Sequence, residues 1–314
     1  MRELEIAGRL INDLNPAYVI AEVGHNHGGS VETAVQMIRV AAACGAEAAK
    51  FQKRSNATLY SEALLNQPYE NENSYGKTYG EHRAALELSV IDYTALQAEA
   101  ARNKIACFAT AFDEQSADDL MSIGVPAIKI ASGGLTDTAL LAHVARLRVP
   151  IILSTGGGTV REIDQAVETI AAVHGQLAIL HCTAAYPVRD FAELNLRCIQ
   201  TFRDRYPYVI GWSGHDSGIA MSVAAYTLGA RIIEKHFTLN RANKGTDHAF
   251  SLEPSGLSKL TRDLQRAHIA MGDGVKRYLP SEVAPVSKMR RRETPDGPRI
   301  TGQKDELDPT ARPA

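Results

Sequence analysis

Residues 151–173 read IILSTGGGTVREIDQAVETIAAV, and this stretch contains one copy of the unit that builds the fold. The apolar run Ile151–Ser154 predicts a short buried strand, and the three glycines that follow predict a tight turn. Thr159 and Glu162 have the spacing of a capping box, which predicts a helix over Val160–Val173. A strand, a turn and a helix in this order are typical of parallel α/β folds.

The same alternation recurs along most of the chain. Apolar runs that predict strands are Tyr18–Val23, Ala46–Phe51, Ile105–Thr110, Ala127–Ala131, Ile151–Ser154, Leu177–His181, Val209–Trp212 and Arg231–His236. Stretches that predict helices are Val31–Cys44, Asp92–Arg102, Glu114–Ile123, Val160–Val173, Ile219–Leu228 and Ser255–Met271. Eight strands alternating with helices over ~250 residues predict a (β/α)8 TIM barrel. The alternative is a doubly wound open sheet, but Gly24–Gly29 lacks the GxGxxG turn that usually follows its first strand.

Three segments lie outside these units. Leu4–Leu10 predicts a short N-terminal hairpin that closes the floor of the barrel. Arg54–Ser89 is a long polar insert after the second strand, and long connections on the catalytic face of a barrel are often lids. Lys288–Ala314 is rich in proline and charge, which predicts a flexible tail. We therefore expect a barrel domain over residues 1–285 and a tail over residues 286–314.

Composition excludes several classes of protein. The chain has 34 basic and 36 acidic residues and a formal net charge of −2, so it has no bulk electrostatic reason to bind nucleic acid or an anionic membrane. No apolar stretch approaches the ~20 residues of a membrane helix, and the first ten residues lack a signal-peptide core. The four cysteines are scattered and form no CxxC, which disfavours a zinc ribbon or a disulfide framework. We expect a cytoplasmic protein that acts on small molecules.

Active sites of TIM barrels lie at the carboxyl ends of the strands. Polar side chains that end the predicted strands, or follow them closely, are Glu22, Lys50, Gln52, Thr110, Lys129, Ser132, Ser154, His181, Thr183, Tyr186, Ser213, His215, Asp216, Glu234, Lys235, His236 and Asp247. Lysine ammonium groups and hydroxyls are suited to a phosphate group. The inventory therefore indicates an anionic, phosphate-bearing ligand.

Two pairs on adjacent strands each leave two interpretations open. His215 and His236 end strands seven and eight, and imidazoles are common ligands of Mn2+ or Zn2+. The alternative is two ordinary polar histidines at the barrel rim. Glu22 and Lys50 end strands one and two, where they would form a salt bridge or do acid–base work. Asp247 follows the last strand, and there it either serves the site or caps a turn.

Nine motifs, one at nearly every predicted strand end, resemble the N-acetylneuraminate (sialic acid) synthase family in order and spacing. They are AEVGxNHxG (21–29), KFQ (50–52), LELS (86–89), TAFD (110–113), KIAS (129–132), ILSTG (152–156), HCTxxYP (181–187), GWSGH (211–215) and EKHFT (234–238). The resemblance covers about residues 15–275. It implies a TIM barrel that condenses phosphoenolpyruvate with a sugar aldehyde, such as N-acetylmannosamine, to give a 2-keto-3-deoxy sugar acid and phosphate by C–O cleavage.

The resemblance also implies roles for individual residues. Lys50, Thr110, Lys129, Ser132, Ser154 and Ser213 would hold phosphoenolpyruvate. His215 and His236 would bind a divalent ion, with Mn2+ expected ahead of Mg2+, Co2+ or Zn2+. Glu22, Tyr186 and Asp247 would handle the sugar and the attacking water, with Glu22 as the base. Gln52 and Thr183 complete the expected substrate-binding set.

The chain departs from the family pattern at three places. Gly134 stands where the family usually has an acidic residue, and Ala184 stands where many members have a polar one. The family's small C-terminal antifreeze-like domain is expected to be absent, which leaves the identity of the sugar open. A homodimer stays open as well, without the domain exchange of the family. The alternative function is a metal-dependent barrel aldolase or isomerase that does not use phosphoenolpyruvate.

Overall fold

The computed structural model describes residues 2–305. Eight parallel strands close into one barrel in the order β10-β3-β4-β5-β6-β7-β8-β9. Their bounds are β3 (Tyr18–Gly24), β4 (Ala48–Lys53), β5 (Ala106–Ala111), β6 (Ile128–Ile130), β7 (Ile151–Ser154), β8 (Leu177–Cys182), β9 (Val209–Gly214) and β10 (Ile232–His236). This confirms the predicted TIM barrel, and each observed strand lies on its predicted apolar run.

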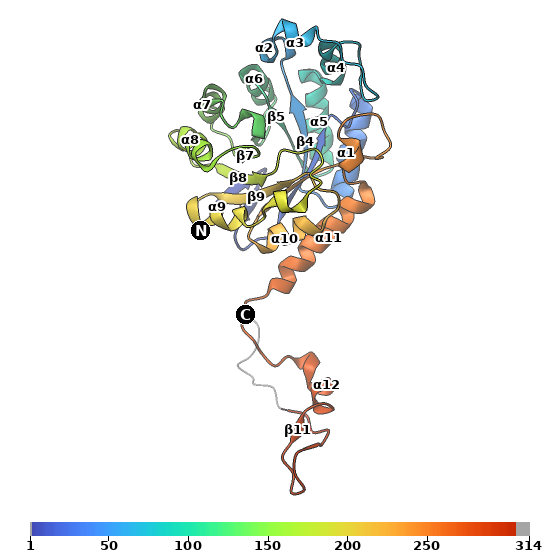
Figure 1. The fold of residues 1–314 in the computed structure, drawn as a ribbon, viewed down its shortest axis with the longest axis vertical. Coiled ribbons are helices and arrows are strands. Elements are labelled where there is room, and N and C mark those ends of the chain that lie inside the picture. The colour runs from blue at the N-terminus through green and yellow to red at the C-terminus, as the bar shows by residue number, and fades with distance from the viewer. Residues whose placement is uncertain (1, 306–314) are drawn as a thin grey trace. The chain divides into compact units, whose positions relative to one another are not determined.

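Helices surround the strands (Figure 1). They are α1 (Val31–Ala43), α5 (Val90–Arg102), α6 (Glu114–Ser122), α7 (Thr138–Arg146), α8 (Val160–Ala171), α9 (Cys198–Arg205), α10 (Ala220–Thr227) and α11 (Pro254–Met271). The sequence did not single out α7 and α9. The helix α9 begins at Cys198 without a side-chain cap, so its start carries no local signal.

The unit β7–α8 shows how local sequence sets the geometry. All four residues of β7 are buried, and the next helix buries one face through Ile163, Ala166, Val167 and Ile170. The predicted capping box is confirmed, because the Glu162 carboxylate accepts a hydrogen bond from the Thr159 backbone N–H at 2.7 Å. Each buried large aliphatic side chain contributes about 1.5–3 kcal/mol to folding. The strand β7 therefore belongs to the inner layer of the barrel, and α8 belongs to the outer layer of helices with its apolar face turned inward.

The N-terminal hairpin is also confirmed. The strands β1 (Glu3–Ile6) and β2 (Arg9–Asn12) pair antiparallel. Ile6 is fully buried, and it lines a cavity together with the first residues of β3 and β5, Tyr18 and Ala106. The hairpin therefore covers the amino ends of the strands, opposite the expected site.

The insert after β4 forms three short helices, α2 (Asn56–Leu59), α3 (Glu62–Leu65) and α4 (Tyr79–Leu86). The Tyr75 hydroxyl donates to the Lys244 carbonyl at 2.6 Å, and the Asn73 side-chain oxygen accepts from the Gly245 N–H at 3.0 Å. These bonds hold the insert against the loop that follows β10. This is the place expected of a lid.

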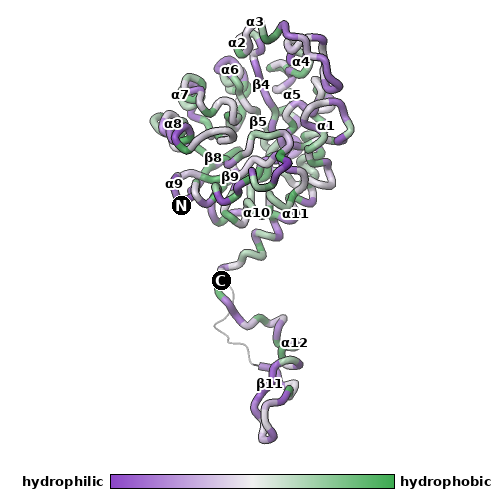
Figure 2. The backbone as a smooth tube through the Cα atoms, in the orientation of Figure 1, coloured by the Kyte–Doolittle hydropathy of each residue, from purple (hydrophilic) through white to green (hydrophobic). Residues whose placement is uncertain are grey.

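The chain forms two compact units, and the first of them ends at His268. The second, Ile269–Ala314, contains η4 (Pro280–Glu282), α12 (Val283–Ser287) and the antiparallel pair of β11 (Arg291–Arg292) and β12 (Arg299–Ile300). The backbone around β11 is mostly hydrophilic (Figure 2). The sequence predicted no regular structure there. Its flexibility stays a prediction, and residues 306–314 lie outside the described part. Within residues 2–305, no helix is both long enough and apolar enough to cross a bilayer.

Candidate active site

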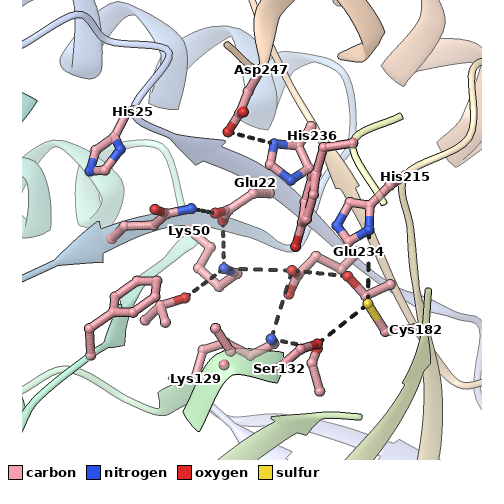
Figure 3. Close-up of a pocket in the computed structure, with 18 of the residues that line it drawn as sticks. Glu22, His25, Lys50, Lys129, Ser132, Cys182, His215, Glu234, His236 and Asp247 are labelled. Atoms are coloured by element: carbon pink, nitrogen blue, oxygen red, sulfur yellow. Dashed lines mark hydrogen bonds and ion pairs between the residues drawn. The ribbon is translucent and has the colours of Figure 1, made fainter. Parts of the chain in front are cut away.

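A polar cavity of about 320 Å³ opens at the carboxyl ends of the barrel strands. Of the thirteen residues predicted for the site, twelve line it: Glu22, Lys50, Gln52, Thr110, Lys129, Ser132, Ser154, Tyr186, Ser213, His215, His236 and Asp247. They come from all eight strands and the loops that follow them, and the closed barrel brings them together. Figure 3 shows many of these side chains converging from different strands.

Glu22 and Lys50 form a buried ion pair on neighbouring strands. The Lys50 Nζ lies 2.6 Å from Glu22 Oε2, and both side chains are 2% exposed. The Thr110 hydroxyl accepts from Lys50 at 2.9 Å, and Gln52 donates to Glu22 at 2.8 Å. Burial raises the pKa of Glu22 to about 7, against the lowering effect of Lys50. A carboxyl group that titrates near neutrality is suited to acid–base work.

Lys129 and Glu234 form the second charged group in the cavity. The Lys129 Nζ donates to Ser154 Oγ at 2.6 Å and lies 4.0 Å from Glu234 Oε1. Glu234 also lies 3.6 Å from Lys50 Nζ, so one carboxylate faces both lysines. Burial lowers the pKa of Lys129. Burial alone would raise the pKa of Glu234, but the positive charges of Lys129 and Lys50 hold it below its usual value. Glu234 was noted as a strand-end residue but received no role in the sequence analysis.

The glycine turn after β7 is required by close packing. The Gly156 N–H donates to Ser132 Oγ at 2.9 Å. A Cβ atom on Gly156 would lie 2.8 Å from that oxygen and 3.0 Å from the Ala184 side chain. Only glycine lets the backbone approach Ser132 this closely. The turn therefore orients a cavity hydroxyl as well as connecting a strand to a helix.

The two predicted metal ligands lie side by side. The rings of His215 and His236 are 5.3 Å apart between centroids, and His236 Nδ1 is 3.6 Å from Asp247 Oδ2. His215 Nδ1 donates to the Thr183 carbonyl at 2.9 Å, so its Nε2 carries a free lone pair. His236 Nδ1 is buried without a hydrogen-bond partner among the described residues. Burial lowers the pKa of both histidines to about 3, which keeps them in the neutral form that ligates metals.

These donors fit a divalent ion, with two neutral imidazoles and a carboxylate beside them. Within residues 2–305, however, no group of three or more His, Cys, Asp or Glu side chains is arranged to enclose a metal on its own. An ion at this place would therefore need further ligands from substrate or water, as catalytic ions commonly have.

Thr183 is the one predicted site residue that does not line the cavity. Its hydroxyl donates to the Glu193 carbonyl at 2.9 Å, and it lines a neighbouring cavity. Its prediction as a substrate-binding side chain does not fit this position, because the chain turns after β8 and directs the hydroxyl toward Glu193. Only its backbone carbonyl reaches the site, where it orients His215.

Other residues of the inventory have structural partners instead. His181 donates to the Leu194 carbonyl at 2.7 Å, and Lys235 pairs with Asp216 at 2.9 Å where both side chains are 1% exposed. Tyr186 lies at the rim, 56% exposed, with its ring 4.2 Å from that of His215.

Two arginines also line the cavity, although no sequence pattern singled them out. Arg54 follows β4, and Arg83 lies in α4 of the insert, yet both line the cavity. Arg54 carried a weak signal, since it comes directly after a strand end. Arg83 carried none, because its place depends on how the insert folds back over the barrel.

Comparison with known proteins agrees with this geometry. Residues 37–276 match the NeuB family. The chain is 38% identical over 289 residues to the N-acetylneuraminate-9-phosphate synthase of Homo sapiens, covering 91% of this chain and 80% of that protein. It is 34% identical to the N,N'-diacetyllegionaminic acid synthase of Legionella pneumophila, covering 91% and 83%.

A solved structure is similar across nearly the whole chain. It is an N-acetylneuraminic acid (sialic acid) synthetase from Leptospira borgpetersenii in complex with citrate, with a TM-score of 0.78 and 31% identity. The match covers 93% of this chain and 98% of that one. The family resemblance predicted from the nine motifs is confirmed, and the chain belongs to the NeuB family.

Proposed function

We propose that this NeuB-family enzyme condenses phosphoenolpyruvate with a sugar aldehyde to give a 2-keto-3-deoxy sugar acid and inorganic phosphate. One observation carries the proposal: two buried lysines, surrounded by hydroxyls, face the same cavity at the mouth of a barrel. Buried cations are costly unless they are paired, and here each lysine also has a hydroxyl partner. A ligand with a phosphate and a carboxylate would complement them.

Lys129, Ser132 and Ser154 would hold the phosphate, because they present an ammonium group and two hydroxyls at one end of the cavity. Lys50 and Thr110 lie beside them and would hold the carboxylate. Ammonium and hydroxyl donors bind such oxygens through charge-assisted hydrogen bonds. With both anionic groups fixed, the enol carbon faces the open part of the cavity, where the sugar enters. Holding two reactants face to face supplies several kcal/mol of the barrier, about 7–11 in favourable cases.

The reaction forms one C–C bond and breaks one C–O bond. The methylene carbon of phosphoenolpyruvate attacks the aldehyde carbon, whose oxygen becomes a hydroxyl after taking up a proton. Positive charge then develops at C2, and water adds there. Glu22 accepts one proton of that water, which balances the proton taken up by the aldehyde oxygen. The second proton leaves the C2 hydroxyl as the keto group forms, and it departs on the phosphate, which leaves with its bridging oxygen. The balance is phosphoenolpyruvate, aldehyde and water on one side, and keto acid and phosphate on the other.

His215 and His236 would hold a divalent ion, which we propose to be Mn2+. When bound, such an ion supplies Lewis-acid polarisation of a carbonyl oxygen. Asp247, next to His236, and Tyr186, whose ring is tilted by 43° against that of His215, would orient the sugar at that end of the cavity.

The decisive experiment supplies purified protein with Mn2+, phosphoenolpyruvate and a panel of aldoses, with and without N-acyl and phosphate groups. We expect equal amounts of inorganic phosphate and a 2-keto acid, measured by phosphate assay and mass spectrometry. In ¹⁸O-water the released phosphate should stay unlabelled, because C–O cleavage keeps its four oxygens. Labelled phosphate would contradict the proposed bond cleavage. Product from pyruvate but not from phosphoenolpyruvate would favour the aldolase alternative.

The Lys129→Met variant tests where the phosphate is held. Its KM for phosphoenolpyruvate should rise about 10- to 100-fold, because a charge-assisted hydrogen bond is lost. The KM for the aldose should change less than about threefold if the two subsites are separate. Steady-state kinetics with each substrate varied in turn measures both values. Lys259→Met, at an exposed position of α11, is the matched control. Unchanged KM for phosphoenolpyruvate in Lys129→Met would show that the phosphate lies elsewhere.

A further inference from the structure

A buried ion pair outside the cavity has no role in the proposed reaction. Lys235 on β10 and Asp216, which follows β9, lie 2.9 Å apart from Nζ to Oδ1, and each side chain is 1% exposed. Neither residue lines the active-site cavity. Burying two charges is costly, and an apolar pair of similar size often gives an equally stable fold. Stability alone therefore does not explain why charged residues stand here.

The pair lies directly behind the two histidines that we assign to the divalent ion. Lys235 precedes His236 in β10, and Asp216 follows His215 just beyond β9. Side chains alternate between the two faces of a strand, so Lys235 points away from the cavity that His236 lines. In the pairing of β9 with β10, Lys235 lies beside Gly214, and this is the last pair between the two strands. Both histidines therefore lie one residue past the end of that pairing.

Lys235 supplies a hydrogen bond at the point where the strand pairing stops. Its Nζ donates to the backbone carbonyl of Asp216 at 2.5 Å, and also to the carboxylate of the same residue. A buried carbonyl without a partner is unfavourable, and an apolar side chain at position 235 has no donor to offer it. Because this carbonyl belongs to the residue after His215, a side chain of β10 holds the backbone that carries the other imidazole.

An indole ring covers the outer side of this contact. Trp212 is the only tryptophan in the chain and is 1% exposed. The Lys235 Nζ lies 5.6 Å from the centre of its ring. A Cβ atom on Gly214 would overlap the same ring, so only glycine at this position lets the indole lie there. The ammonium group is thus enclosed between Trp212 and Asp216, away from water.

The other hydrogen bonds of the two histidines do not set the distance between them. His215 Nδ1 donates to the Thr183 carbonyl after β8, and the His236 carbonyl accepts from the Leu252 N–H at 2.7 Å. Each bond ties one histidine to its own neighbouring loop. Within residues 2–305, no side chain other than this lysine hydrogen-bonds residues 215–216 to β10.

We propose that Lys235, with Asp216 as its counter-ion, is a positioning residue that fixes the separation of His215 and His236 and so sets the affinity for the divalent ion. This inference rests on the metal site of the proposed function, and it adds two residues that do not touch the ion. Groups behind the ligands of a metal commonly change its affinity by about 10- to 100-fold. A small shift of either imidazole weakens binding, because metal–ligand bonds tolerate little change in length.

The test removes both charges at once, so that no unpaired charge is left in the interior. Lys235→Met/Asp216→Leu should raise the Kd for Mn2+ by about 10- to 100-fold, measured by electron paramagnetic resonance without substrates. Lys235→Arg keeps a charged donor, so its Kd should stay within about threefold of the wild-type value. The unfolding temperature of the double variant should stay close to that of the wild type. The fluorescence of Trp212 should keep the short-wavelength maximum of a buried indole.

Arg203 and Asp13 provide a matched control. They form an ion pair of 2.6 Å, and Arg203 also donates to the backbone carbonyl of Gly229 at 3.0 Å, shortly before β10 begins. Arg203→Met/Asp13→Leu therefore removes the same kind of contact at the opposite end of the strand from His236. This variant should bind Mn2+ as the wild type does, whatever happens to its unfolding temperature.

Three results would contradict the positioning role. The pair only stabilises the fold if the folded double variant binds Mn2+ as tightly as the wild type. The effect is not specific to the histidines if the control variant loses as much affinity. If the double variant does not fold, the milder Asp216→Asn decides, because it weakens the charge-assisted bond that holds Lys235. Its Kd should rise by about three- to tenfold, and an unchanged Kd would overturn the inference.

The same measurements separate this inference from the proposed function. If wild-type protein binds Mn2+ but forms no keto acid with any aldose, the proposed reaction fails, and the Mn2+ affinities of the variants still decide the role of Lys235. If wild-type protein forms keto acid and the double variant keeps its affinity for Mn2+, the reaction stands and the positioning role fails. If wild-type protein binds no Mn2+, the metal site and this inference fail together.

Discussion

Replacing Glu22 by glutamine is expected to lower kcat by about 10²- to 10⁴-fold, the usual contribution of a general base. The variant keeps the shape of the side chain and its bond to Gln52, but it cannot accept a proton from water. The KM for the aldose should change little. The KM for phosphoenolpyruvate should change far less than kcat does, because Lys50 loses its ion pair with Glu22 but keeps Thr110 and Glu234 as partners. Steady-state kinetics at saturating substrates measures the loss, and Glu168→Gln, exposed on α8, is the control. Wild-type turnover in Glu22→Gln would rule out this role.

The pH profile gives a second, independent measure of the same role. The pKa of Glu22 is raised to about 7, chiefly by burial. Because the deprotonated form accepts the proton, kcat/KM should rise with pH up to about 7 and level off above it. This acidic limb should disappear in Glu22→Gln. A limb that persists unchanged in the variant would have to come from another group.

Replacing His215 or His236 by alanine should lower turnover by about 10³-fold or more, since a Lewis acid contributes several kcal/mol to such a reaction. Each variant should also lose its affinity for Mn2+, because one of the two neutral imidazoles is gone. Electron paramagnetic resonance of free and bound Mn2+ measures this binding without reference to activity. His143→Ala is the control, because His143 pairs with Asp118 on the barrel surface.

The barrel should stay folded in both histidine variants, since the rings lie at the cavity and not in the apolar core. Circular dichroism and thermal unfolding check this point. If a folded His236→Ala protein binds Mn2+ as tightly as wild type, the metal site lies elsewhere. If it turns over normally in the presence of a chelator, the reaction needs no such ion.

Local sequence patterns were enough for the architecture. The apolar run at Ile151–Ser154 and the capping box of Thr159 and Glu162 act within a few residues, so their effect on the backbone can be predicted without knowing the rest of the chain. Repeating that unit around the chain leaves the closed barrel as the arrangement that buries every strand. The strand-end residues of the site followed from the same reasoning, since a barrel places all carboxyl ends on one face.

The partners of those side chains could not be predicted, because they depend on strand stagger and on the path of the loops. Glu234 on β10 faces Lys50 on β4, two strands away, and Lys129 on β6, across the barrel, which requires the closed ring of strands. Thr183 turns its hydroxyl away to Glu193, and Arg83 arrives from an insert without any periodic signal. The periodic pattern of apolar residues therefore predicts which strand-end side chains lie at the mouth of the barrel. Distances across the mouth, and the charge that the insert adds there, come from contacts between segments far apart in the chain.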